Sequence, residues 1–153
     1  MSNGMIDSVY RDILIKPDVG YKVDADNETI TGDEVDTLGY EGCAFLILLD
    51  QGEVKASALT VKVQQDTVTG MGSAADVEGT GDTADTAVGT DASILMDIKK
   101  PRERFLRIHA TIANMNTAVP LRIIAILYNA VVVPVTQVVK SAELHVEPAE
   151  GTA

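Results

Sequence analysis

The chain has 153 residues, which suits a single domain of ordinary size with one hydrophobic core. Its hydrophobic content of 46% argues against a disordered chain, whereas its aromatic content is only 4%. So few aromatic side chains disfavour a stacking platform for sugars or for single-stranded nucleic acid. The formal net charge of −11 also disfavours nucleic-acid binding, because an acidic surface repels phosphates.

The cysteine and targeting patterns indicate a cytoplasmic origin. Cys43 is the only cysteine and lies in an apolar run, so no disulfide can form within the chain and we expect a buried, unreactive thiol. No apolar stretch is as long as a transmembrane helix. Residues 1–5 lack the basic and apolar regions of a signal peptide. We therefore expect a soluble protein, made in a reducing cytoplasm and without a membrane partner.

In chain order, the first predicted strands are two short segments, 13–16 and 21–24. The Pro and Gly residues of 17–20 predict a turn between them. The next predicted strand, 43–49, is apolar on both faces. A strand of this kind is either central in a sheet or has its outer face covered by another chain.

The clearest periodicity in the sequence is two residues, which indicates β-strands. The segments 57–65 and 104–112 each alternate between apolar and polar side chains. Such a strand covers a core with one face and meets solvent or a partner with the other. The apolar positions are Leu59, Val61 and Val63 in the first segment, and Leu106, Ile108, Ala110 and Ile112 in the second.

Between these two strands lies an acidic segment, 66–91, rich in Gly, Ala, Thr and Asp. It contains five Asp, one Glu and no Lys or Arg. Because it has little apolar surface to offset the entropy cost of ordering, we expect one long acidic loop, either mobile or held by a neighbouring subunit.

The remaining predicted strands are 93–98, 121–128 and 131–139. Segment 121–128 is apolar on both faces, as 43–49 is. Pro134 interrupts the last segment and marks an edge, a bend or a bulge, because proline cannot donate a ladder hydrogen bond. No segment has a capped amphipathic helical pattern. We therefore expect an all-β fold, an antiparallel β-sandwich of jelly-roll-like type with about eight strands.

The expected domain organisation is one β-sandwich with two extended arms. The sandwich spans 9–140, the N-terminal arm 1–8 and the C-terminal arm 141–153. The C-terminal arm has little core character and ends in EPAEGTA. Arms of this kind can become ordered when they bind a partner.

A search for catalytic or metal-binding patterns finds no credible site. His109 falls on the polar face of a predicted strand, and His145 lies in the C-terminal arm. One cysteine cannot form a zinc cluster of the usual spacing. The carboxylates in 76–91 do not have the spacing of an EF-hand calcium loop, so a solvated acidic loop is the simpler interpretation. We expect no enzyme activity, no metal and no cofactor.

The basic residues gather at one place. Five of the twelve Lys and Arg residues lie within 99–107, with Glu103 as the acidic residue among them. One interpretation is a solvated turn at the start of a strand. The other is a patch that binds an acidic partner surface, such as the loop or tail of an adjacent copy. The candidate interface residues are Lys99, Lys100, Arg102, Arg104 and Arg107.

Several stretches together resemble a family of phage structural proteins. They are DTLGYEG at 36–42, DIKKPRERFLR at 97–107, IIAILYNA at 123–130 and PVTQ at 134–137. The pattern is similar to that of the capsid decoration, or cement, proteins of tailed bacteriophages, over roughly 36–65 and 93–137. None of the stretches is a catalytic signature.

The resemblance implies a structural role on a virion. Members of that family are small all-β proteins, often jelly-roll-like, that typically bind the capsid exterior as trimers and bridge subunits of the major capsid protein. It therefore implies a homotrimer that stabilises the head, with the major capsid protein as partner. Two alternatives stay open, namely another phage component of the tail or baseplate, and a glycan-binding β-sandwich on the particle surface.

Overall fold

The computed structural model describes residues 12–25, 28–49, 54–86, 92–115, 119–133 and 135–139. Every regular element within these residues is a β-strand, as the sequence predicts. The strands are β1 (Leu14–Ala25), β2 (Thr29–Thr31), β3 (Val35–Asp36), β4 (Tyr40–Leu49), β5 (Val54–Asp66), β6 (Ala75–Asp76), β7 (Asp82–Thr86), β8 (Ala92–Lys99), β9 (Phe105–Met115) and β10 (Val119–Ala130).

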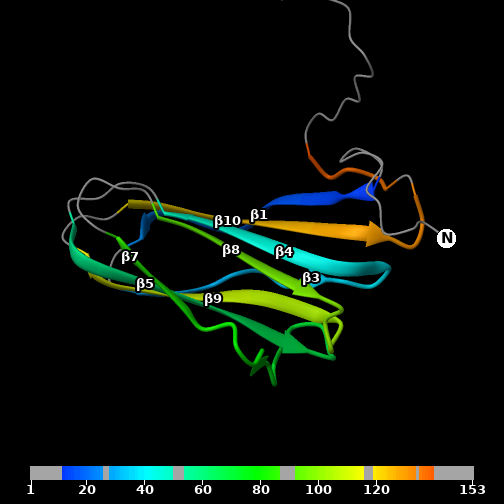
Figure 1. Cartoon of the computed structure of the whole chain (residues 1–153), viewed down its shortest axis with the longest axis horizontal. Coiled ribbons are helices and arrows are strands. Elements are labelled where there is room, and N and C mark those ends of the chain that lie inside the picture. The colour runs from blue at the N-terminus through cyan, green and yellow to red at the C-terminus, as the bar shows by residue number, and fades with distance from the viewer. Residues whose placement is uncertain are drawn as a thin grey trace, which may run out of the picture.

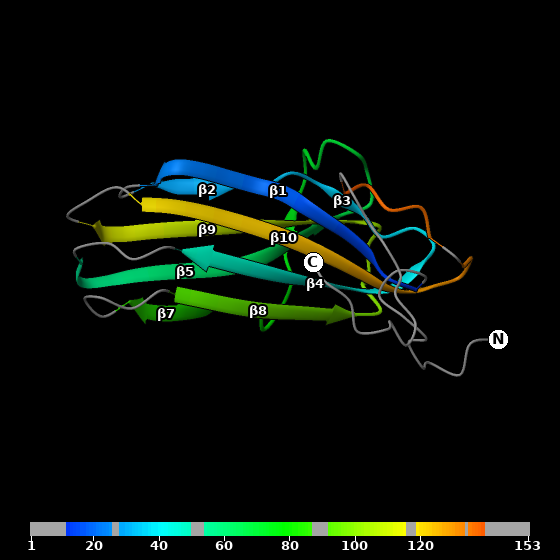
Figure 2. The same cartoon turned by 90° about the horizontal axis from the view of Figure 1, so that it is seen from above.

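The strands form two antiparallel sheets that lie one above the other (Figure 1). Sheet A has the order β1-β10-β4-β8, which Figure 2 shows from above. Sheet B has β9 and β5 at its centre, with β2 and β3 beside β9, and β6 and β7 beside β5. The predicted β-sandwich is therefore confirmed. The chain crosses repeatedly from one sheet to the other.

The core lies between the sheets and is built by alternate residues of the long strands. On β5, Leu59, Val61 and Val63 are fully buried, whereas the residues between them face outward. Phe45 of β4 supplies the one fully buried aromatic ring among the described residues. The period-two pattern thus sets which face of each strand is buried, because successive side chains of a strand point to opposite faces.

The runs 43–49 and 121–128 lie in β4 and β10, the two central strands of sheet A. The prediction of central strands is therefore confirmed. Cys43 of β4 is buried in the core, and burial raises the pKa of its thiol to about 12. The thiol stays protonated, as expected for an unreactive core cysteine.

β1 is one long strand where the sequence predicts two strands and a turn. Its pairing with β10 shifts in register between Lys16 and Gly20, so the segment around Pro17 forms a β-bulge. An edge strand tolerates this proline because one side of the strand needs no ladder donor. A Cβ atom on Gly20 would lie 2.6 Å from Ile123 Cδ1, which explains a glycine there. At the other edge of sheet A, β8 pairs with β4 in unbroken register.

The loop predicted for 66–91 is too long. Residues 75–76 and 82–86 form β6 and β7, which both pair with β5. The prediction missed them because an edge strand is held by its backbone hydrogen bonds and needs few apolar side chains. Residues 87–91 lie outside the described residues.

The strand predicted at 131–139 is wrong. β10 ends at Ala130, after Asn129 adopts a positive φ of 53°, and the described residues beyond it form no strand. Val131 and Val132 are 80% and 76% exposed. Their β-branched side chains suit a strand, but no strand of the described residues pairs with them. The arms predicted at 1–8 and 141–153 lie outside the described residues.

Candidate protein-interaction surfaces

The outer face of sheet A is apolar across its centre. Cross-strand pairing sets Ile124 of β10 beside Leu46 of β4, and Leu46 beside Leu95 of β8. Leu95 is 66% exposed and Leu48 is 37% exposed. We call this surface the apolar face; it comprises Ile15, Ala44, Leu46, Leu48, Leu95, Ile124 and Ile126. Leu48 and Leu95 are exposed, and the other five residues of the face are half-buried. A contiguous exposed apolar patch marks an interaction site in many soluble proteins.

Polar groups border the apolar face. Near one end, the Arg122 guanidinium stacks over the Tyr21 ring at 4.8 Å from its centroid. Near the other, the Tyr128 hydroxyl donates a hydrogen bond to Asp97 Oδ1 at 2.6 Å. Partial burial and this carboxylate raise the pKa of Tyr128, so the hydroxyl remains a donor. The bordering polar groups are thus engaged with one another.

The outer face of sheet B is polar. Thr29 lies beside Thr111, and Thr31 beside His109. Lys62 of β5 forms an ion pair with Asp76 of β6 at 2.7 Å. The two outer faces of the sandwich therefore differ: one is suited to water and the other leaves apolar side chains exposed.

The five candidate basic residues do not form one patch. Arg104 makes a bidentate ion pair with Asp36, with Nε–Oδ1 at 2.8 Å and Nη2–Oδ2 at 2.7 Å. The same turn is tied a second time, because the Thr37 hydroxyl donates to the Arg104 carbonyl at 2.7 Å. Arg107 lies on the outer face of β9 and donates to Gln64 Oε1 at 2.9 Å. Arg104 and Arg107 thus hold the chain to itself.

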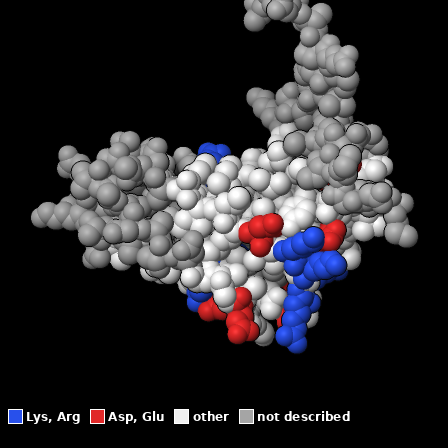
Figure 3. All heavy atoms as spheres, in the orientation of Figure 1, with Lys and Arg blue, Asp and Glu red and all other residues white. Residues whose placement is uncertain are grey.

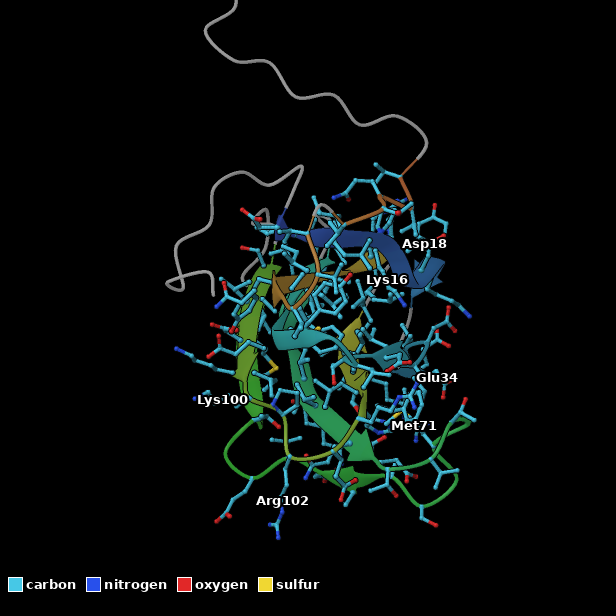
Figure 4. All side chains as sticks on the ribbon, turned by 90° about the vertical axis from the view of Figure 1, so that its right-hand side faces the viewer. Lys16, Asp18, Glu34, Met71, Lys100 and Arg102 are labelled. Atoms are coloured by element: carbon cyan, nitrogen blue, oxygen red, sulfur yellow. The ribbon has the colours of Figure 1, made fainter. Side chains whose placement is uncertain are left out.

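The other three form an exposed cluster, which we call the basic tip: Lys99, Lys100 and Arg102. Lys99 and Lys100 are 66% and 76% exposed, and they share one carboxylate, Glu41, at 3.9 and 4.0 Å. Arg102 makes no hydrogen bond or ion pair within the described residues. Figure 3 shows Lys and Arg atoms gathered at this end of the molecule, and Figure 4 shows Lys100 and Arg102 projecting from it.

The basic tip borders a shallow hollow between two turns. The hollow has a volume of about 350 Å³ and is lined by 37–41 and 100–104. Leu38 at its rim is 67% exposed. Gly39 and Lys100 both have positive φ, 89° and 54°, and the Lys100 N–H donates to the Glu41 carbonyl at 2.7 Å. Hydrogen bonds thus hold both turns that line the hollow.

A second group of contacts at the same end holds the connection between β5 and β6. Asp66 is 5% exposed, and its carboxylate accepts the N–H groups of Val68 and Ser73 at 3.1 and 3.0 Å. Glu34 accepts the Gly70 N–H and the Thr69 hydroxyl, both at 2.5 Å. These bonds lower the pKa of both carboxyl groups. Contacts within the chain thus hold the connection between β5 and β6.

The structure describes one of the two histidines, His109. His109 lies on the outer face of sheet B beside Thr31, and partial burial together with the neighbouring Lys62 lowers its pKa. His145 lies outside the described residues. Within the described part of the chain, no three His, Cys, Asp or Glu side chains come together as metal ligands would.

The chain matches no model of a known protein family, no curated protein and no solved structure. Among the described residues there is no helix long and apolar enough to cross a membrane. The surfaces of the molecule are therefore the basis for assigning a function.

Proposed function

We propose that this protein decorates the exterior of a tailed-bacteriophage head and stabilises it. The resemblance to capsid decoration proteins, over roughly 36–65 and 93–137, supports this proposal, and so does the β-sandwich fold. The assembly partners are the major capsid protein and further copies of the chain, arranged as a homotrimer on the virion.

The observation that carries the proposal is the apolar face. A sandwich that works alone in water has no need of exposed leucines such as Leu48 and Leu95 on the outer face of a sheet, and sheet B shows that the same chain can build a polar outer face. We assign the capsid shell as the occupant of the apolar face. Charges of opposite sign at its borders, Arg122 and Asp97, would fix the orientation of the contact.

The difference between the two outer faces suits a layer on a shell. Copies joined side by side can all turn their apolar faces toward the shell and their polar sheet B faces toward water. Each copy then needs to bind only weakly, because linked copies bind together far more tightly than one alone.

The test is binding to undecorated heads of the phage that carries the gene. Purified chain is mixed with heads, and the bound fraction is measured by co-sedimentation while light scattering reports the mass of the free protein. We expect saturable binding and an increased resistance of the heads to heat. The head assignment would be refuted if the chain did not bind heads and a cryo-electron microscopy map of the virion showed it on the tail or baseplate.

The glycan-binding alternative has less support. It requires a groove lined by aromatic side chains. The second hollow, of about 380 Å³ between β1 and β2, contains one aromatic residue, Tyr21. One face of that ring is covered by Arg122. Binding of the chain to a glycan array would revive this alternative.

A further inference from the structure

The basic tip and the C-terminal segment lie at opposite edges of sheet A. The tip follows β8, one edge strand. The last described segment, 135–139, is held near β1, the other edge, where Gln137 Nε2 donates to the Ile13 carbonyl at 2.5 Å. Two strands, β10 and β4, separate the edges, so they are about 14 Å apart or more.

The two regions are chemically complementary. The basic tip offers two lysines that share one distant carboxylate and an arginine without a partner in the described residues. The adjoining hollow offers the exposed side chain of Leu38. Residues 141–153 contain no Lys or Arg, and they combine acidic with apolar residues. These residues are Glu143, Leu144, Val146, Glu147 and Glu150.

We propose that residues 141–153 of one copy dock in the hollow beside the basic tip of the next copy. The inference rests on the proposed function in one respect, that copies of the chain assemble with one another. The glutamates would pair with Lys99, Lys100 and Arg102, and an apolar side chain of the segment would cover Leu38. An extended chain rises about 3.3 Å per residue, so residues 140–153 reach about 45 Å, enough to cross to a neighbour.

We commit to the tail of a neighbouring copy because the proposed function already joins copies of the chain. The chain that follows β10 and the hollow lie at the same end of sheet A, where the Val131 N–H donates to the Gly39 carbonyl at 2.8 Å. A tail docked on its own tip would leave the mass of the assembly unchanged in the variants, so the experiment below separates the two arrangements. Docking on a neighbour joins two different surfaces, which is a heterologous contact, and such contacts close into rings when the rotation between copies allows it. Side-by-side copies in a ring also keep their apolar faces on one side.

The experiment is a charge exchange in the full-length chain. The tip variant carries Lys99→Glu, Lys100→Glu and Arg102→Glu, and the tail variant carries Glu143→Lys, Glu147→Lys and Glu150→Lys. Glu78→Lys, an exposed charge reversal between β6 and β7, is the control. Light scattering after size exclusion reports the mass of each protein and of a combined variant that carries both sets of reversals, and thermal melting confirms that each variant folds.

We expect the tip variant and the tail variant each to dissociate at concentrations where the wild type and the control assemble, with affinity between copies weakened by roughly 100-fold or more. A combined variant that carries both sets of reversals is expected to reassemble, because the lysines of each tail then meet the glutamates of the next copy's tip in every contact of the ring.

Three results would overturn the inference. If both variants assemble like the wild type, the two surfaces do not meet, although the proposed function stands. If the tip and tail variants dissociate and the combined variant does not reassemble, the tail does not pair with the basic tip of another copy. If the wild type itself stays monomeric both in solution and on heads, self-association fails and the proposed trimer fails with it.

Discussion

Replacing Leu95 by serine tests the role of the apolar face. Leu95 lies on β8 at the outer end of the row that it forms with Leu46 and Ile124. Full burial of a leucine side chain stabilises by about 1.5–3 kcal/mol. Because Leu95 is 66% exposed, a partner that covers it completely gains about 1–2 kcal/mol per copy.

We therefore expect Leu95→Ser to weaken binding to heads by about 5- to 30-fold for a single copy, since 1.4 kcal/mol corresponds to a factor of ten. For three linked copies the loss multiplies to about 100-fold or more. The free energy of unfolding should change by less than about 0.5 kcal/mol, because the side chain is mostly in water. Co-sedimentation with heads measures the first quantity and urea denaturation the second.

The matched control is Val68→Ser, which removes an equally exposed apolar side chain, 61% exposed, from the connection after β5. Unchanged affinity of Leu95→Ser for heads would refute the assignment of the apolar face to the shell. If the variant instead binds heads but falls apart into monomers, the face joins copies of the chain to one another.

Four further predictions follow from single contacts. Thr37→Val should lower the free energy of unfolding by about 1 kcal/mol in urea denaturation, since its buried hydroxyl bonds the Arg104 carbonyl; no change would show that bond to be dispensable. Arg104→Glu should lower the melting temperature, whereas Arg102→Glu should leave it unchanged; equal effects would contradict the division of the basic residues. The free energy of unfolding should fall below about pH 4, because the pKa of Asp66 is lower in the folded chain than in the unfolded chain. The ionised carboxylate therefore stabilises the fold fully above the ordinary carboxyl pKa, and this stabilisation is lost as the pH falls through the pKa of the folded state. An Asp66→Asn variant with the same acid dependence would exclude this carboxylate. Iodoacetamide should label Cys43 only after denaturation, as mass spectrometry can measure, and rapid native labelling would contradict its burial.

The sequence predicts well those parts of the fold in which the side-chain pattern is set by burial. The alternating segments became β5 and β9, and the two-sided apolar runs became the central strands β4 and β10. In these strands each residue's chemistry reports directly on the face it occupies. The apolar and polar pattern within one strand is therefore enough to predict which of its faces lies against the core.

The errors fall where backbone pairing or distant partners decide. Pro17 and Gly20 read locally as a turn, but pairing with β10 keeps them within one strand as a bulge. The polar segment 82–86 became an edge strand through hydrogen bonds to β5. The valines of 131–133 have high β-propensity, yet no strand of the described residues pairs with them.

The sequence locates the basic residues of the candidate interface, but it does not show which of them have partners within the chain. Spacing alone gathers five basic residues into 99–107, but it cannot show that Arg104 is bound by Asp36, which lies 68 positions earlier. Nor does it show that Arg107 turns to Gln64 of a neighbouring strand. The hollow beside Leu38 lies between two turns that are distant in sequence, so no local sequence motif predicts it.

The bulge in β1 has a consequence for the chain at high concentration. Unpaired sheet edges can recruit further strands and grow into fibrils. In sheet A, Pro17 and the bulge interrupt the β1 edge, and β8 is the one edge with unbroken pairing. Two molecules that joined through their β8 edges would leave no regular edge in that sheet for a third. The edges of sheet B are short strands, which offer few unpaired backbone groups to a further strand.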